Sequence, residues 1–312
     1  MSSRWKRYAL FGHPVGHSVS PGMFNAALGS FGERDVYTAL DLANESDLRD
    51  AVDDLRSGAI DGANITLPYK QTVLGLVDAV APSAHEVGAA NVLTVSEGRV
   101  TAHNTDVDAL ATEIAAQWSG KPRSRAAVIG GGGAALAAIA ACRRLGFKLV
   151  CATSRSWSNS EAMYEATSAA RARALGVLTT LWPGDGEEPT TERSKASQVL
   201  RLQWKDLVAD ADCVIQATSA GMLGGSRGDD VAAIVPWDRL PPHALVYDVV
   251  YNPTVTPFLA AARQHGFQAE GGLGMLVRQA ELAIKMWTGH DAPVDLMRRA
   301  AEEALAARGT QA

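Results

Sequence analysis

A lysine that ends the segment NITLPYK (residues 64–70) is the first candidate for acid–base chemistry. In this segment a short apolar strand gives way to a threonine, a proline, an aromatic residue and Lys70. Pro68 suits the first turn of a helix, so we expect Lys70 near a helix start, where backbone N–H groups carry a partial positive charge. A cation in that position needs an anionic or electron-rich group opposite it.

Other polar side chains that could bind a ligand lie near predicted strand ends or on a helix flank. Asp106 ends the segment NTD (104–106), and its alternative role is to cap a helix that starts at residue 107. Asn91 follows GAA near another strand end. Gln279 falls on the apolar flank of a predicted helix, where an amide needs a partner. That partner is either a ligand or a neighbouring carbonyl.

Ser18 and Ser20 form a second candidate binding element in HSVSP. In an extended segment, side chains two residues apart point the same way, so both hydroxyls could bind two oxygens of one ligand. The alternative for Ser20 is an N-cap for the helix that Pro21 begins.

A glycine-rich turn, VIGGGGAALAAIA, follows a predicted strand and opens a predicted helix. Its spacing G-x-G-G-A, at Gly130, Gly132, Gly133 and Ala134, favours a dinucleotide pyrophosphate, because glycines let the backbone approach and a helix N-terminus attracts anions. A tight turn without a ligand is the alternative.

The next strand ends in CATSRS, where Arg155 occupies the position at which an acidic residue would hold the ribose hydroxyls of NAD. An arginine accepts a 2′-phosphate, which favours NADP. A solvated surface arginine is the alternative reading of Arg155.

The elements that must position these residues alternate along the chain. Apolar runs predict strands and helical patterns predict helices between them, which indicates parallel βαβ units in two regions separated by a linker at 120–125. Residues 183–198 are polar without an apolar period and predict an exposed loop. The predicted strands are 7–12, 35–42, 59–65, 126–130, 148–154, 211–219 and 244–251, and the predicted helices include 21–31, 45–58, 107–118, 134–146 and the C-terminal region from 273.

Composition excludes several classes of function. The 312 residues carry a net charge of −5, with 47% hydrophobic and 20% charged residues, as in soluble globular proteins. The acidic balance argues against nucleic acid and anionic membranes as partners. The start of the chain lacks a signal-peptide core, and three dispersed cysteines favour buried thiols in a reducing compartment, so we expect a cytoplasmic protein. The histidines have no metal-binding spacing.

Taken together, these segments resemble the shikimate dehydrogenase family. Counterparts of its motifs run through nearly the whole chain in order: FGHPVGHSVSP, NITLPYK, GAANVL, NTD, the glycine turn, ATSAGM, DVVYNPTVTPFL and GLGMLVRQAELAIKMWTG. The resemblance implies an NADP-dependent oxidoreductase of aromatic amino acid biosynthesis that interconverts 3-dehydroshikimate and shikimate, with NAD as the alternative cofactor.

The resemblance also implies residue roles. Lys70 and Asp106 match the family's catalytic pair, and the partner is a small carboxylate polyol. The implied substrate contacts are Ser18 and Ser20 for the carboxylate, Thr66, Asn91 and Gln279 for ring hydroxyls, and Tyr251 nearby. The cofactor contacts expected from the turn and the resemblance are Gly130, Gly132, Gly133, Ala134, Ser154, Arg155, Ser156, Thr218, Gly272 and Met275.

Some positions depart from the family pattern. The residues after NTD are Val107, Asp108 and Ala109, where the family commonly has G-x-G. Family members often have a second basic residue, a few positions after the one that matches Arg155, to bind the 2′-phosphate of NADP, and here Asn159 falls near that position. These departures leave open an NAD-preferring quinate or amino-shikimate dehydrogenase. A non-catalytic ligand sensor on the same scaffold is the alternative of a different class, and the retained Lys70 and Asp106 argue against it.

We therefore expect an α/β protein of two domains. Residues 1–106, completed by C-terminal helices in 271–312, form an α/β substrate domain. Residues 107–270 form a doubly wound, Rossmann-type dinucleotide-binding domain. A homodimer is left open.

Overall fold

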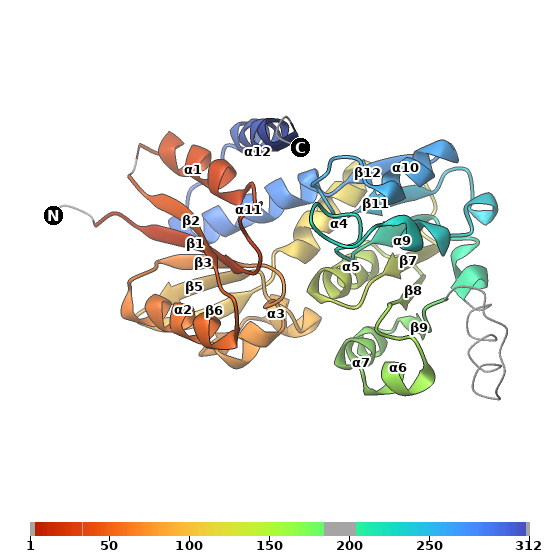
Figure 1. Cartoon of the computed structure of the whole chain (residues 1–312), viewed down its shortest axis with the longest axis horizontal. Helices are drawn as coiled ribbons and strands as arrows, with labels where there is room; N and C mark the ends of the chain where they lie inside the picture. The colour runs from red at the N-terminus through yellow and green to blue at the C-terminus, as the bar shows by residue number, and fades with distance from the viewer. Residues whose placement is uncertain (1–3, 33, 184–203, 310–312) are drawn as a thin grey trace. The chain divides into compact units, whose positions relative to one another are not determined.

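The computed structural model describes residues 4–32, 34–183 and 204–309. It forms two compact units, Met1–Ala109 with Gly274–Ala312 and Leu110–Leu273 (Figure 1). The first boundary falls inside helix α4 (Asp106–Ala116) and the second at the start of α11 (Leu273–Thr288). Both units are α/β, as predicted.

The first unit contains a mixed sheet. The parallel pairs β1–β2 and β1–β3 come from the predicted βαβ units. The strands β5 and β6 instead form an antiparallel hairpin, which the prediction of parallel units missed. Its turn residues Glu97 and Gly98 both have positive φ, as short hairpin turns require. In pairing order the strands are β2 (Val36–Asp41), β1 (Arg7–Gly12), β3 (Gly62–Ile65), β5 (Val92–Ser96), β6 (Arg99–His103) and β4 (Ala79–Val80).

Helices cover both faces of this sheet (Figure 1). The amphipathic helix α2 (Glu45–Ser57) packs its apolar stripe into a core with Ala9 and Phe11 of β1. On the opposite face, Tyr8 of β1 stacks on Trp287 of α11, with ring centroids 4.8 Å apart. The other helical elements of this unit are α1 (Ser20–Ser30), η1 (Thr72–Gly75), α3 (Pro82–Val87) and α12 (Val294–Gly309).

The second unit contains a fully parallel sheet with the doubly wound strand order of a Rossmann fold. The chain starts in the middle of the sheet at β7, builds outward through β8 and β9, and then returns to the other side of β7. This reversal creates the switch point where such folds bind ligands. In pairing order the strands are β12 (Gln268–Gly271), β11 (Leu245–Asp248), β10 (Cys213–Gln216), β7 (Arg125–Ile129), β8 (Leu149–Thr153) and β9 (Leu178–Thr180).

The helices of the second unit connect these strands. Helix α5 is almost fully buried along its alanine-rich face, which lets it pack closely on the sheet. Cys142, Cys151 and Cys213 are buried free thiols, as predicted, and burial raises the pKa of each. The helices are α5 (Gly133–Arg144), α6 (Ser160–Glu165), α7 (Thr167–Ala174), α9 (Asp229–Ala233), η2 (Trp237–Arg239) and α10 (Pro257–Gln264).

Two local predictions were wrong. Ser20 is the first residue of α1 rather than its cap: Val19 holds the cap position, and no side chain caps this helix. Pro68 does not open a helix, because residues 67–71 form a turn and η1 begins only at Thr72. Lys70 therefore lies in that turn.

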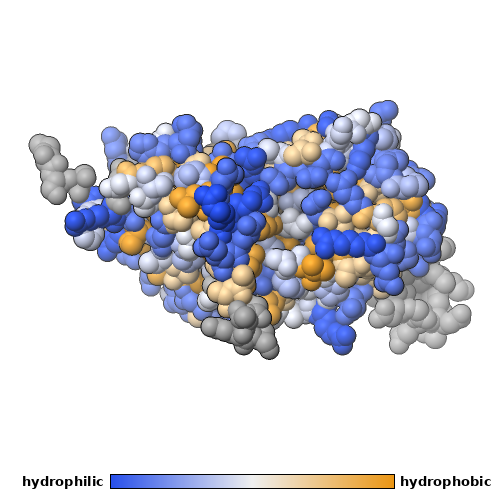
Figure 2. Space-filling view, turned by 90° about the horizontal axis from the view of Figure 1, so that it is seen from above, coloured by the Kyte–Doolittle hydropathy of each residue, from blue (hydrophilic) through white to orange (hydrophobic). Residues whose placement is uncertain are grey.

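Within the described part of the chain, no helix is long and apolar enough to cross a membrane. On the face drawn in Figure 2, hydrophobic residues lie in small groups among hydrophilic ones. The predicted loop at 183–198 lies outside the described residues except for Pro183.

Candidate active site

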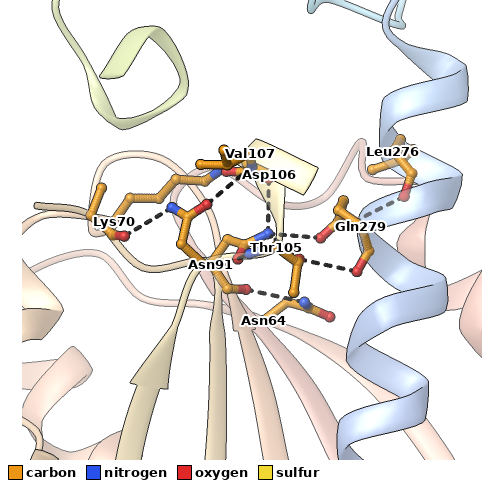
Figure 3. Close-up of polar contacts among 10 residues, drawn as sticks. Asn64, Lys70, Asn91, Thr105, Asp106, Val107, Leu276 and Gln279 are labelled. Atoms are coloured by element: carbon orange, nitrogen blue, oxygen red, sulfur yellow. Dashed lines mark hydrogen bonds and ion pairs between the residues drawn. The ribbon is translucent and has the colours of Figure 1, made fainter. Parts of the chain in front are cut away.

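Lys70 and Asp106 form a buried ion pair in the first unit (Figure 3). Lys70 Nζ lies 2.5 Å from Asp106 Oδ2, and the two side chains are 17% and 4% exposed. Asp106 is the first residue of α4, where the helix dipole favours a carboxylate. Asp106 therefore supplies the anionic partner that Lys70 needs, but Lys70 keeps limited access to solvent.

Asn91 fixes the other side of the aspartate. The two N–H groups of its Nδ2 are shared among three acceptors, Asp106 Oδ1 at 2.8 Å, Thr105 Oγ1 at 2.9 Å and Gln279 Oε1 at 3.1 Å. Its Oδ1 accepts from the Thr105 backbone N–H at 2.8 Å. Both Asp106 oxygens are thus bound by nitrogen donors, so the carboxylate cannot rotate without breaking a buried hydrogen bond.

Gln279 joins this network from α11. Its Nε2 donates to the Leu276 carbonyl at 3.0 Å, and its backbone carbonyl accepts from Thr105 Oγ1 at 3.2 Å. The buried amide therefore has protein partners on both atoms, including the neighbouring carbonyl that the sequence left as an alternative. This arrangement holds Gln279 beside Asn91 without requiring a ligand.

Strand ends bring these residues together. Lys70 follows β3, Asn91 precedes β5 and Asp106 follows β6, and these three strands are neighbours in the sheet. The backbone N–H of Ala90 donates to the Lys70 carbonyl at 2.7 Å, which ties the lysine turn to the start of β5. Several separate segments of the chain thus converge on one polar cluster.

The end of β1 and the residues just after it, which lead to the serines, lie beside Thr66, the residue before the lysine turn. Thr66 N–H donates to the Phe11 carbonyl at 2.9 Å, and His13 N–H donates to the Leu67 carbonyl at 2.8 Å. Ser18 Oγ accepts from the Ser20 backbone N–H at 3.2 Å. Because Ser20 does not cap α1, its hydroxyl is not committed to the helix, which leaves the ligand-binding interpretation in place for both serines.

The glycine turn of the second unit has the geometry of an anion cradle. Gly130 has φ +142°, and a Cβ there would lie 2.6 Å from the Ala217 carbonyl oxygen. Gly132 is the cap residue of α5, and no side chain caps this helix. Gly133 and Ala134 begin α5, so their N–H groups belong to the unsatisfied first turn. The turn therefore fits a dinucleotide pyrophosphate.

The segment after β8 lies against this turn. A Cβ on Gly131 would come within 2.8 Å of Ser154 Oγ, and Ser154 Oγ lies 2.9 Å from Ser156 Oγ. Arg155 is exposed, as an arginine that meets a ligand phosphate must be. Asn159, near the expected second basic residue, instead caps α6 by accepting from Ala162 N–H at 2.9 Å.

The remaining predicted residues lie at other strand ends. In the second unit, Thr218 follows β10 and accepts from Ala220 N–H at 3.1 Å, and the half-buried Tyr251 follows β11. Gly272 follows β12, where a Cβ would collide with the Val249 carbonyl oxygen. Met275, buried in α11, belongs to the first unit.

Asp248 is a buried acid at the end of β11 that the sequence reading did not single out. Thr256 Oγ1 donates to its Oδ2 at 2.5 Å, and Val250 N–H donates to its Oδ1 at 2.9 Å. Burial outweighs these hydrogen bonds and raises the pKa of Asp248 to about 7. Through these hydrogen bonds the Asp248 carboxyl holds together the two ends of the loop that contains Tyr251.

Sequence reasoning missed three residues, two in the polar network around Lys70 and Asp106 and one in the glycine turn. Asn64 links Tyr37, whose hydroxyl donates to it at 2.8 Å, to the Asn91 carbonyl at 3.1 Å. Thr105 bridges Asn91 and Gln279. Gly131 has no side chain, which leaves room for the Ser154 hydroxyl. A polar residue in the buried strand GANI was a usable signal for Asn64. No pattern in the sequence indicated the tertiary partners of Thr105.

Comparisons with known proteins agree with this architecture. A family model described as "Shikimate dehydrogenase substrate binding domain" matches residues 10–93, and one described as "Shikimate 5'-dehydrogenase C-terminal domain" matches residues 272–302. A shikimate dehydrogenase (NADP(+)) from Citrifermentans bemidjiense is 35% identical over 312 residues, covering 99% of this chain and 98% of the relative.

Solved structures of shikimate and quinate dehydrogenases share this fold. The shikimate 5-dehydrogenase from Thermus thermophilus, in complex with NADP(H) and shikimate, has a TM-score of 0.75 and 30% identity, covering 96% of this chain and 100% of that one. A quinate dehydrogenase from Corynebacterium glutamicum, in complex with NAD, has a TM-score of 0.77 and 25% identity, covering 96% and 99%. The chain belongs to the shikimate dehydrogenase family.

Proposed function

We propose that this protein catalyses the reversible, NADP-dependent reduction of 3-dehydroshikimate to shikimate, with Lys70 and Asp106 as its catalytic pair. The first unit would bind the substrate and the second the dinucleotide. The observation that carries this proposal is the buried Lys70–Asp106 contact of 2.5 Å, fixed on its far side by Asn91. Family membership supports the substrate class and the cofactor.

Lys70 would act on the oxygen that changes bond order. When bound, the dinucleotide would supply the hydride for the carbonyl carbon. As negative charge develops on the carbonyl oxygen, the Lys70 ammonium stabilises that charge and then donates a proton to it. In the oxidation direction, neutral Lys70 accepts the hydroxyl proton. General acid–base help of this kind is worth ~10²–10⁴ in rate.

Asp106 and its neighbours would orient the lysine and the ring. Asp106 holds Nζ of Lys70 in place, and Asn91 holds Asp106. Ser18 and Ser20 would bind the substrate carboxylate, and Thr66, Asn91 and Gln279 would bind ring hydroxyls, with Tyr251 nearby. The amides of Asn91 and Gln279 already contact each other at 3.1 Å, so a substrate hydroxyl would add to an ordered pair.

The second unit would bind the dinucleotide along the ends of its strands. The first turn of α5 would bind the pyrophosphate, and Arg155 with Ser154 and Ser156 would bind the 2′-phosphate. Thr218 and Gly272 follow β10 and β12, on the other side of the switch point, and would contact the nicotinamide half of the dinucleotide. Met275, in the first unit, remains a predicted cofactor contact.

A Lys70→Ala variant tests the proposal. Its kcat with shikimate and NADP should fall by ~10²–10⁴, while the Kd for shikimate stays within about tenfold, because the carboxylate contacts remain. Lys285→Ala is the matched control, since it removes a lysine from an exposed pair with Asp291. Rates close to wild type in Lys70→Ala would refute the catalytic assignment.

A second candidate function is an NAD-preferring quinate or amino-shikimate dehydrogenase. The likeness to a quinate dehydrogenase in complex with NAD supports it. The contact between Arg155 and Asp230 also supports it, because Arg155 is the residue expected to bind the 2′-phosphate and here it pairs with a carboxylate. Turnover of quinate with NAD above that of shikimate with NADP would favour this alternative.

A further inference from the structure

Arg155 contacts an acidic residue in the second unit. Its Nη1 lies 3.2 Å from Asp230 Oδ2, and both its terminal nitrogens lie 3.3 Å from Ser226 Oγ. The side chains of Arg155 and Asp230 are 41% and 44% exposed. The guanidinium is thus held by a weak, solvent-accessible contact, which a stronger anion can displace.

The strand order shows where this contact runs. Arg155 follows β8, while Ser226 and Asp230 follow β10, and β7 lies between these two strands. All three are parallel, so their carboxyl ends share one edge. Gly130, at the end of β7, approaches Ala217 after β10, and Gly131 approaches Ser154 after β8. The Arg155–Asp230 contact therefore spans the ends of the strands on both sides of the glycine turn.

A 2′-phosphate and Asp230 would compete for the same cation. The phosphate needs the donor nitrogens of the guanidinium, and Nη1 already faces the Asp230 carboxylate. The carboxylate would also repel a phosphate bound nearby, since like charges disfavour each other. A nucleotide without the 2′-phosphate neither competes with Asp230 for Arg155 nor places a phosphate near the Asp230 carboxylate.

We propose that Asp230 is a specificity-determining residue for the cofactor, which holds Arg155 toward the segment after β10 and so reduces the preference for a 2′-phosphorylated nucleotide. This inference rests on the proposed function, in which Arg155 meets the 2′-phosphate. Asp230 acts through Arg155 and sets how strongly the protein distinguishes NADP from NAD.

The chain offers a matched control for this proposal. Asp229 precedes Asp230 in α9 and carries the same charge, but it pairs with Arg227 at 3.2 Å. Asp230→Asn and Asp229→Asn therefore change the net charge equally, and only the first releases Arg155.

The experiment is calorimetric titration of the full chain with adenosine 2′,5′-bisphosphate and, separately, with adenosine 5′-monophosphate. Asp230→Asn should tighten the bisphosphate Kd about three- to tenfold and leave the monophosphate Kd within about twofold. The gain should shrink as salt is raised, because the contact is exposed. Asp229→Asn should leave the ratio of the two Kd values within about twofold of wild type.

Four results would overturn the inference. An unchanged ratio in Asp230→Asn would show that Asp230 does not control Arg155, and an equal shift in Asp229→Asn would show a general charge effect. A full-sized shift from Asp230→Asn in an Arg155→Met background would show that Asp230 does not act through Arg155. A wild type that binds neither nucleotide would instead refute the proposed cofactor site itself, and the inference with it.

Discussion

Both oxygens of Asp106 accept hydrogen bonds from side chains, one from Lys70 and one from Asn91. A carboxylate held in this way can orient the lysine only while it keeps its charge. Asp106→Asn preserves the shape but brings a neutral amide, with its own N–H donors, against the ammonium and the Asn91 amide. The consequence should appear in kcat more than in substrate binding.

We expect Asp106→Asn to lower kcat with shikimate by ~10² or more and to change KM by less than about tenfold. Asp108→Asn, an exposed change in the same first turn of α4, should keep kcat near wild type. Rates are compared per folded enzyme, measured by circular dichroism, because a buried lysine without its partner destabilises the fold. An Asp106→Asn variant with kcat within twofold of wild type would contradict the role given to this residue.

Asp248 gives a pH-dependent prediction. Its pKa is raised to about 7 by burial, against an ordinary value of 3.8, so the folded chain retains a proton that the unfolded chain releases. This contribution to stability is full below about pH 4, declines as the pH rises toward 7, and is lost above that. The difference of about three pH units corresponds to at most ~4 kcal/mol.

Asp248→Asn should remove this decline. Urea unfolding of both proteins at several pH values between about 4.5 and 7.5 measures it, and the free energy of unfolding of the wild type should fall relative to the variant as the pH rises. Parallel pH profiles for the two proteins would mean that Asp248 does not stay protonated in the folded state.

The individual residues of the site could be predicted better than their contacts. Lys70, Asn91, Asp106 and Gln279, all chosen from the sequence, lie in one hydrogen-bonded cluster. That the buried glutamine needed a partner followed from the cost of an unsatisfied amide. Which partner it has did not follow, because Asn91 and Gln279 are far apart along the chain and meet only through the packing of α11 within the first unit.

At the scale of elements, the glycine turn between β7 and α5 gives a paired test. A Cβ at Gly131 would lie 2.8 Å from Ser154 Oγ, while a Cβ at Gly132 would have no heavy atom within 4 Å. A side chain at Gly131 would therefore meet Ser154, while the space beside Gly132 is empty of protein atoms and is available to the pyrophosphate.

Gly131→Ala should lower the free energy of unfolding by about 1–3 kcal/mol through this contact. Gly132→Ala should leave stability near wild type and weaken NADP binding by roughly tenfold, the equivalent of about 1.4 kcal/mol. Urea unfolding and fluorescence titration with NADP measure the two effects. Wild-type affinity for NADP in the Gly132 variant would place the pyrophosphate elsewhere.

Element boundaries followed local signals closely where a single residue decides them. Asn44 caps α2 through its side chain, and Gly58 ends that helix in the left-handed conformation, as its position after the apolar pattern indicated. Pro68 misled because a proline is compatible with a helix start and with a turn, and residues 67–71 form a turn. The error at Ser20 was one position, because Val19 rather than Ser20 precedes the first residue of α1.

At the scale of the whole molecule, the alternation of strands and helices predicted two α/β regions, and the parallel sheet of the second unit follows from it. The mixed sheet of the first unit does not, because β5 runs antiparallel to both of its neighbours, β3 and β6, and the turn at Glu97 and Gly98 joins β5 to β6. The domain roles remain predictions: substrate in the first unit and dinucleotide in the second.

The central claim is that this protein is an NADP-dependent shikimate dehydrogenase, and initial rates of cofactor reduction test it most directly. The measurement uses shikimate and quinate, each with NADP and with NAD, on the full chain. The account predicts the highest kcat/KM for shikimate with NADP. A higher value for quinate or for NAD would contradict it and identify a specialised relative, and an absence of turnover in all four combinations would refute the catalytic role of Lys70 and Asp106.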